Sequence, residues 1–389
     1  MNVLIIYPNG NALNPHSGAE TRIWTLNYAL INRNFEVLVL HSLNSKGFED
    51  NELKKKCKVF YNKPLGNFSF YLSDLNPFYI IKLFQIIHKY NVEIIQLEFP
   101  WGFITAKFLA KKKTKLIYDS QGIESEFMKN AVKNPKFPKI LKPLAKIFGY
   151  FYEKLVCKLA DVIINVSMVD RDYYIKNYKI PKSKTFLIQT PSTLNFEGSK
   201  RTEANKIQCR KKLSLPLDKT IVIFHGGLPH PPNQEAFNLI NNYISPNIEN
   251  PDILFVLAGH NLSKFRKNNI ISLGFVENLK DFLYMADFAI VPLLSGSGMR
   301  IKIMDYIITA LPFITTKNGI EGIDFVKRDR DFLLYDTVNE SFLEGIRLLH
   351  NDKKLRQKLH ENLLKEGNTL NRSKFEYKFF KLYSRIKEL

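Results

Sequence analysis

The feature that most constrains the fold of this chain is an alternation of short, wholly apolar runs with glycine turns and helical segments. Val3–Tyr7 is an apolar run followed by a loop that ends at Gly18, where a helical pattern begins. The same order restarts at Thr220–Phe224, which precedes the glycine turn Gly226–Gly227 and another helical pattern. Continuous apolar runs joined by helices are typical of strands that are buried on both faces of a parallel sheet. The alternation therefore predicts an α/β protein.

Because the pattern starts twice, the sequence predicts two domains. At 389 residues the chain is longer than a single hydrophobic core usually serves. We expect two Rossmann-like, doubly wound domains at residues 1–195 and 196–370, facing each other across a cleft. A polar stretch at 194–212 is the expected linker, and a helix at 371–389 is expected to pack back on the N-terminal domain. The first glycine loop does not spell GxGxxG, so a nicotinamide site is disfavoured.

A basic helix start follows the apolar run Phe288–Pro292. The turn after this run contains Gly298, and the spacing places Arg300 and Lys302 in the first turn of the next helix. Cations are unfavourable there by roughly 0.3–1 kcal/mol, because the helix dipole already makes this end positive. A bound phosphate would remove the conflict, and Asp305 on the same helix is placed to accept hydrogen bonds from sugar hydroxyls. The alternative is a solvated helix with a Lys302–Asp305 pair.

Polar residues also follow two apolar runs of the N-terminal half. Glu98 comes directly after one run, and Asp119 and Gln121 come after the next. Ligands of parallel sheets bind beyond the carboxyl ends of the strands, so these three residues are candidates for a substrate site. For Asp119, a role as the cap of a helix that begins near Ile123 stays open.

The charge balance points to an anionic partner. The chain has 57 Lys and Arg against 37 Asp and Glu, a net charge of +20. Such an excess favours nucleic acid, phosphorylated small molecules or an anionic membrane surface, although a general abundance of lysine accounts for it as well. The lysines are dispersed and no nucleic-acid-binding module is recognisable, so we expect no nucleic acid partner.

The segment Lys129–Lys158 interleaves lysines with Phe, Ile, Leu and Tyr. Two interpretations stay open: an amphipathic surface that lies on anionic lipid, and a domain-wall helix with a solvated lysine face. Three widely spaced cysteines fit a reducing compartment. Neither a signal-peptide core nor an apolar run of about 18 residues is present. We therefore expect a cytoplasmic protein, with a peripheral place on the cytoplasmic membrane face left open.

These residues resemble the group 1 glycosyltransferases, family 4, which are retaining enzymes with the GT-B fold. The likeness covers most of the chain and is strongest at residues 225–233, 296–305 and 319–322. The resemblance implies that a hexose-type sugar moves from a nucleoside-diphosphate donor to a hydroxyl acceptor. The basic, aromatic segment Lys129–Lys158 suggests that this acceptor is lipid-linked or lies at a membrane surface, and a sugar such as a surface glycan precursor is the alternative. The resemblance also implies that the C-terminal domain holds most of the donor and the N-terminal domain the acceptor.

The resemblance assigns roles to single residues. Arg300 and Lys302 would hold the leaving diphosphate, Asp305 the nucleotide ribose, and Gln121 stands near the sugar, where relatives often have a histidine. The other implied substrate-binding residues lie in the matching motifs, and their glycines and amides let the diphosphate approach the backbone. They are Gly18, Asp119, Gly226, Gly227, Asn233, Ser297, Gly298, Met299 and Glu321.

The sequence departs from the family pattern at two positions, since Ser297 and Asp305 stand where relatives have glutamates. These two differences leave the identity of the donor sugar open. No metal or other cofactor is expected if the protein supplies the positive charge; the alternatives are the DxD-like pairs at 170–172 and 329–331. No placed carboxylate nucleophile is evident, which favours a front-face displacement. A sugar-nucleotide epimerase and a non-catalytic, membrane-associated subunit of the same fold are the competing readings.

Overall fold

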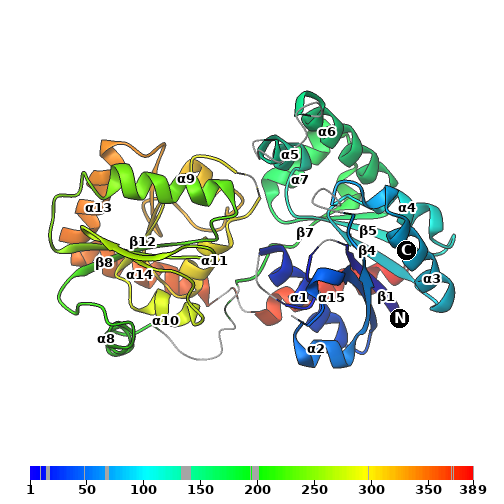
Figure 1. Cartoon of the computed structure of the whole chain (residues 1–389), viewed down its shortest axis with the longest axis horizontal. Coiled ribbons are helices and arrows are strands. Elements are labelled where there is room, and N and C mark those ends of the chain that lie inside the picture. Colours follow the sequence, from blue (N-terminus) through cyan, green and yellow to red (C-terminus); the bar gives the residue numbers. More distant parts are fainter. Residues whose placement is uncertain are drawn as a thin grey trace. The chain divides into compact units, whose positions relative to one another are not determined.

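The computed structural model describes residues 1–8, 10–14, 18–47, 49–65, 70–132, 142–192, 194, 201–296, 298–368, 370 and 372–388. The chain divides into two compact units, Met1–Thr193 with Arg372–Leu389, and Leu194–Asn371. Each unit is built on its own seven-stranded sheet with helices on both faces (Figure 1). The predicted α/β class is confirmed in both units.

The first unit has an all-parallel sheet with the strand order β3-β2-β1-β4-β5-β6-β7. The interiors of its central strands are buried, as expected of a sheet that is covered on both faces. The strands are β1 (Asn2–Tyr7), β2 (Glu36–Ser42), β3 (Lys58–Asn62), β4 (Ile94–Glu98), β5 (Lys115–Ser120), β6 (Val162–Asn165) and β7 (Thr185–Leu187).

Two groups of helices cover the two faces of this sheet (Figure 1). On one face, α1 (Gly18–Ile31) packs against α15 (Arg372–Glu388), and both contribute side chains to a common core. The other face is covered by α3 (Pro77–Lys89), α4 (Phe103–Leu109), α6 (Lys142–Leu159) and α7 (Met168–Asn177). The other helical segments in the described part of this unit are η1 (Leu43–Ser45), α2 (Asn51–Lys56), η3 (Ser73–Leu75), α5 (Glu124–Ala131) and η5 (Lys182–Lys184).

The second unit repeats the doubly wound arrangement. Its strand order is β10-β11-β9-β8-β12-β13-β14, parallel except for the antiparallel edge strand β10. The strands are β8 (Thr220–His225), β9 (Ile253–Ala258), β10 (Lys264–Lys267), β11 (Ile270–Leu273), β12 (Phe288–Val291), β13 (Phe313–Thr316) and β14 (Leu333–Tyr335).

The helices of the second unit also lie on both faces of its sheet, with α9 on one face and α10 on the other (Figure 1). They are α8 (Glu203–Lys212), α9 (Pro231–Leu239), its continuation η6 (Ile240–Ile244), α10 (Leu279–Tyr284), α11 (Ile301–Ile308), α12 (Lys317–Ile320), α13 (Glu340–Asn351) and α14 (Lys353–Gly367).

Each sheet has a point at which the strand order reverses. In the first unit it lies between β1 and β4, and in the second between β8 and β12. Loops that leave the carboxyl ends of these strand pairs run to opposite faces of the sheet, which opens a place for a ligand. The residues singled out by sequence follow these strands or lie beside them.

Candidate functional site

In the second unit, the chain leaves β12 through a glycine turn and enters α11. Gly296 and Gly298 take φ angles of 107° and 77°, a backbone region that favours glycine. Gly298 is buried and Met299 half-buried beside it. Ser297, which was predicted to bind substrate, lies outside the described residues. The glycines and the start of α11 follow the carboxyl end of β12.

Arg300 lies directly before α11, and its side chain turns back toward the preceding loop. Its guanidinium is only 6 % exposed and donates to the backbone carbonyls of Gly298 at 3.0 Å and Ser295 at 3.5 Å. The carboxylate of Glu321, directly after α12, lies 3.9 Å from it. The sequence had placed Arg300 in the first helical turn. This was wrong by one residue, because Arg300 has the extended conformation of a helix N-cap and α11 begins at Ile301.

Lys302 joins α11 to the glycine turn that follows β8. Its ammonium donates to Oδ1 of Asn233 at 2.8 Å and lies 4.0 Å from the ring centroid of Phe224. The amide nitrogen of Asn233 in turn donates to the carbonyl of Gly227 at 2.9 Å. Burial and the nearby Arg300 lower the pKa of Lys302 well below its ordinary value.

Gly226 has a steric reason to be glycine. A Cβ atom at this position would lie 2.6 Å from the side-chain amide of Asn233. Gly227 has room for a Cβ, whose nearest neighbours would be 3.7 Å away. The first of the two predicted glycines is therefore needed for packing, whereas the second could carry a Cβ atom at ordinary contact distances.

Asp305 lies on α11 one turn after Lys302 and is 1 % exposed. Its negative charge opposes the lowering of the Lys302 pKa by burial. The second unit thus gathers Gly226, Asn233, Arg300, Lys302 and Asp305 around the point where its strand order reverses.

In the first unit, polar side chains meet at the carboxyl ends of β4 and β5. Glu98 and Asp119 are register partners on these adjacent strands, and both are fully buried. Gln96 donates to both carboxylates, at 2.8 Å and 3.0 Å. Burial and the neighbouring charge of Asp119 raise the pKa of Glu98 well above its ordinary value.

A buried arginine pairs with Asp119, one of these two carboxylates. Nε of Arg22 donates to both oxygens of Asp119 at 3.0 Å, and its Nη2 lies 2.9 Å from Oδ1. Arg22 comes from α1, on the face of the sheet that α15 also covers, and Tyr383 of α15 donates to Gln96. Asp119 is therefore the counter-ion of Arg22, and the alternative that it caps the following helix is wrong.

Gln121 lies at the edge of this network. Its Nε2 donates to Oε2 of Glu98 at 2.8 Å, which fixes the orientation of the amide group. With the nitrogen held by Glu98, Oε1 of Gln121 is the atom that can accept a hydrogen bond from a ligand. Gly18 opens α1, and the residues directly before it lie outside the described part of the chain.

Comparison with known protein families identifies the family to which the chain belongs. The family model "Glycosyl transferases group 1" matches residues 219–352, and the model "Glycosyltransferase Family 4" matches residues 16–192. The chain belongs to the group 1 glycosyltransferases. The predicted family is thereby confirmed, and the protein is a glycosyltransferase.

Solved structures agree with this glycosyltransferase over its whole length. Sucrose-phosphate synthase from Thermosynechococcus elongatus has a TM-score of 0.76 at 15 % identity, covering 100 % of this chain and 99 % of its own. HepE from Anabaena, in complex with UDP and glucose, has a TM-score of 0.70 at 15 % identity; the match covers 98 % of this chain and 99 % of HepE. WaaG, a glycosyltransferase involved in lipopolysaccharide biosynthesis, has a TM-score of 0.70 at 11 % identity; the match covers 97 % of this chain and 98 % of WaaG. These likenesses establish the GT-B fold. No curated protein matches the sequence.

The DxD-like pairs of the glycosyltransferase have structural partners. Asp170 accepts a hydrogen bond from the hydroxyl of Ser167 at the start of α7, and Asp331 accepts from Arg330 and from the amide of Lys327. Within the described ranges, no group of three or more His, Cys, Asp or Glu side chains is placed to hold a metal ion.

Sequence reasoning missed two residues: Arg22, beside the buried carboxylates of the first unit, and His225, beside the glycine turn of the second unit. Arg22 is the only basic residue of α1, one turn from the core residue Leu26, so a cation on a buried stripe was its signal. His225 ends β8 directly before the glycine turn. Burial and the charge of Lys302 lower its pKa to about 3, so the imidazole is neutral. Its buried Nε2 has no hydrogen-bond partner among the described residues.

Proposed function

We propose that this glycosyltransferase moves a sugar from a nucleoside diphosphate to an acceptor hydroxyl with retention of the anomeric configuration. The observation that carries the proposal is the pair of cations at the β8–β12 reversal. Arg300 is buried and Lys302 is half-buried, and both lie beside a glycine turn and a helix start. The crystal structures of HepE with UDP and with UDP-glucose support a nucleotide ligand for this fold.

The cations would act on the leaving group. As the bond from the anomeric carbon to the diphosphate breaks, the electron pair passes to the phosphate oxygen. Arg300, Lys302 and the backbone amides of the turn would stabilise this charge without having to reorganise. A bound diphosphate also counters the unfavourable burial of the Lys302 ammonium, so donor binding and Lys302 protonation favour each other. The acceptor oxygen bonds to the anomeric carbon, and its proton leaves on the departing phosphate oxygen.

The remaining residues would position the two substrates. Asp305 is proposed to accept hydrogen bonds from the ribose, and Glu321 to keep Arg300 in place through their 3.9 Å contact. On the acceptor side, Gln121 presents an oriented Oε1 to a hydroxyl, because its nitrogen is held by Glu98. Gln121 positions and does not transfer a proton at neutral pH.

The test is a pair of substitutions with a matched control. Arg300→Ala and Lys302→Ala are each expected to lower kcat/KM for transfer by about 10²–10³-fold, because each removes charge that stabilises the leaving group. Lys353→Ala, an exposed lysine of α14 in the same unit, serves as the control and keeps wild-type activity. Unchanged turnover in both site variants would refute the role of the cations.

Product analysis distinguishes a retaining glycosyltransferase from a sugar-nucleotide epimerase. A screen of nucleoside diphosphates by thermal shift identifies the donor base, and the anomeric proton coupling of the product reports retention or inversion. Nucleotide-sugar incubated without acceptor should persist or be slowly hydrolysed. Formation of an isomeric nucleotide-sugar under these conditions would instead indicate an epimerase.

A further inference from the structure

Three neighbouring helices of the first unit form one outward surface. α3, α4 and α6 cover the same face of the sheet, and α4 contacts both of the others. Their inner sides are buried in the core through residues such as Leu83, Phe103 and Val156. We call the outer side of these three helices the outer helical face.

The outer helical face is unusually apolar. On α6 its exposed residues recur at helical spacing, and Phe151 is 62 % exposed. On α4, Phe108 is 85 % exposed. The exposed large apolar residues of the face are Phe78, Ile81, Phe84, Phe108, Leu144, Ile147, Phe148, Phe151 and Leu155. Scattered apolar residues are normal on a surface, but a contiguous set on adjacent helices marks an interaction surface.

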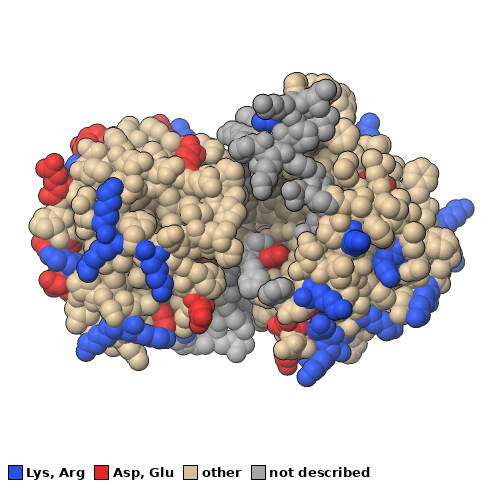
Figure 2. Space-filling model, in the orientation of Figure 1, with Lys and Arg blue, Asp and Glu red and all other residues tan. Residues whose placement is uncertain are grey.

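The charges on the same helices are of one sign. α3 and α4 contain no acidic residue, and the only one in α6, Glu153, is fully buried and accepts hydrogen bonds from three tyrosines. The lysines of the described side chains are Lys82, Lys89, Lys107, Lys142, Lys154 and Lys158. In Figure 2, blue side chains gather on the outer margin of this unit, with few red ones among them.

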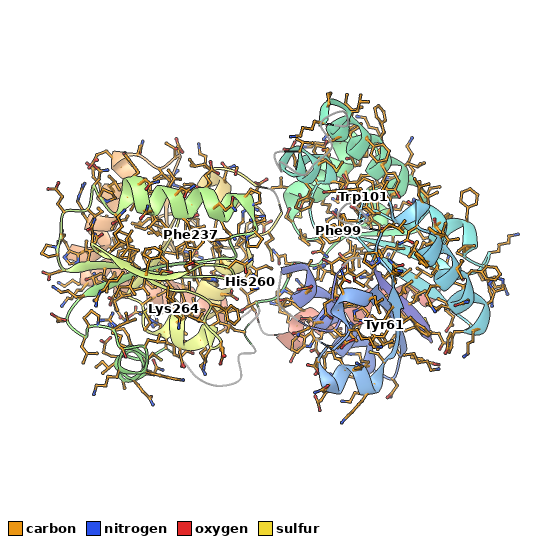
Figure 3. The ribbon with its side chains drawn as sticks, viewed as in Figure 1. Tyr61, Phe99, Trp101, Phe237, His260 and Lys264 are labelled. Atoms are coloured by element: carbon orange, nitrogen blue, oxygen red, sulfur yellow. The ribbon has the colours of Figure 1, made fainter. Side chains whose placement is uncertain are left out.

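The apolar stripe of α6 is anchored to the core. The ring of Phe148 stacks on Trp101, with centroids 5.8 Å apart, and Tyr152 stacks on the same indole at 4.5 Å. Trp101 is 1 % exposed and lies close to Phe99 (Figure 3). The exposed residues are therefore presented by a fixed helix and do not hang from a loose segment.

We propose that the outer helical face docks on the surface of a bilayer that contains anionic phospholipid. Exposed Phe, Ile and Leu side chains would enter the boundary between headgroups and acyl chains, and the lysines would remain among the lipid phosphates. A second copy of this chain fits less well, since it would bring lysines of the same sign together. No described helix is long and apolar enough to cross a membrane, so the mode of attachment is interfacial. The proposal is independent of the reaction.

Vesicle flotation of the full chain tests the docking. We expect the protein to float with vesicles of equal parts phosphatidylcholine and phosphatidylglycerol, and to remain below vesicles of phosphatidylcholine alone. Binding should fall as salt is added, because the lysine contribution is screened. Failure to float with the anionic vesicles would overturn the proposal.

Two variants locate the surface. Phe108→Ser with Phe151→Ser should reduce the floated fraction several-fold, because both side chains point outward. Phe275→Ser, an exposed phenylalanine of the second unit, is the matched control and should float like the wild type. Scanning calorimetry should show the same unfolding transitions in all three proteins, which shows that both units of each are folded. Equal flotation of the double variant, or a dimer in sedimentation velocity that the double variant abolishes, would overturn the assignment.

Discussion

A single buried ion pair organises the carboxyl edge of the first sheet. Arg22 and Asp119 are both fully buried and come from parts of the chain that are 97 residues apart. Because the guanidinium holds both oxygens of Asp119, the charge of one residue compensates the desolvation of the other. Among the described residues no cation forms an ion pair with the neighbouring Glu98, and burial together with the charge of Asp119 raises its pKa. Its contact with Gln121 links this ion pair to the proposed acceptor site.

The first prediction at this scale concerns the buried ion pair between Arg22 and Asp119. Asp119→Ala should lower the free energy of unfolding by roughly 3–5 kcal/mol, because it leaves the Arg22 guanidinium buried without its counter-ion. The exposed pair Lys219–Asp252 provides the control, and Asp252→Ala should cost less than about 1 kcal/mol. Urea denaturation measures both. The double variant Arg22→Met with Asp119→Leu should be more stable than Asp119→Ala, and a double variant that is less stable would contradict this account.

At the scale of elements, α5 and α6 meet around two buried acids. Glu124 lies in the first turn of α5 and Glu153 on α6, where Tyr118, Tyr174 and Tyr178 donate to its carboxylate. Burial raises the pKa of Glu153 to about 7. Burial and the charge of Glu153 raise the pKa of Glu124 to about 8. The contact between these helices should therefore weaken as the two acids ionise.

The second prediction follows from the raised pKa of Glu124. In the unfolded chain Glu124 ionises near its ordinary pKa of 4.5, but in the folded protein it keeps its proton until about pH 8. The unfolded state then binds fewer protons between these values, so stability falls as the pH rises through that window. Glu124→Gln removes this loss. Its gain in stability over the wild type should grow by roughly 2–4 kcal/mol between about pH 5 and pH 9.

Denaturation of both proteins across the pH series measures this gain. Glu344→Gln, an exposed glutamate of α13, is the matched control, and its curve should run parallel to that of the wild type. A constant difference between Glu124→Gln and the wild type at every pH would show that Glu124 is not the titrating group.

At the scale of the whole molecule, the chain closes its first unit with its last helix. α15 contributes Phe379, Leu382, Tyr383 and Ile386 to the core that also contains residues of α1 and β1. The first unit is therefore incomplete until the second has been synthesised. The second unit has all of its strands and helices within Leu194–Asn371.

The third prediction is that a chain ending before Arg372 loses the fold of the first unit only. Without α15 a large apolar surface of the first core is exposed to water, at a cost that exceeds the usual stability of a domain. Calorimetry should show one remaining transition, and limited proteolysis should leave a fragment of the second unit. Tyr377→Ser, on the exposed side of α15, is the control and should keep both transitions. A truncated chain with both transitions intact would contradict the prediction.

Much of the architecture was accessible from sequence because its signals are local. Apolar runs such as Val3–Tyr7 and Thr220–Phe224 mark strands through the character of their own residues, and turn glycines such as Gly298 mark backbone conformations that other residues avoid. The doubly wound class follows from these signals, and the family and the GT-B fold were implied by the resemblance of the motifs; all three are confirmed. The roles of Arg300, Lys302 and Asp305 stay predictions, as do the cytoplasmic location and the absence of a cofactor.

By itself, the sequence determined the order of strands, turns and helices, and with it the two positions where a ligand fits such sheets. Only the tertiary structure decided which distant residues meet there: Arg22 with Asp119, Tyr383 with Gln96, and Lys302 with Asn233. It also decided that Arg300 turns back on its own loop, and that α3, α4 and α6 share one apolar face. The physical reason is range, because local propensities act over a few residues, whereas these contacts join segments whose proximity depends on how the whole chain packs.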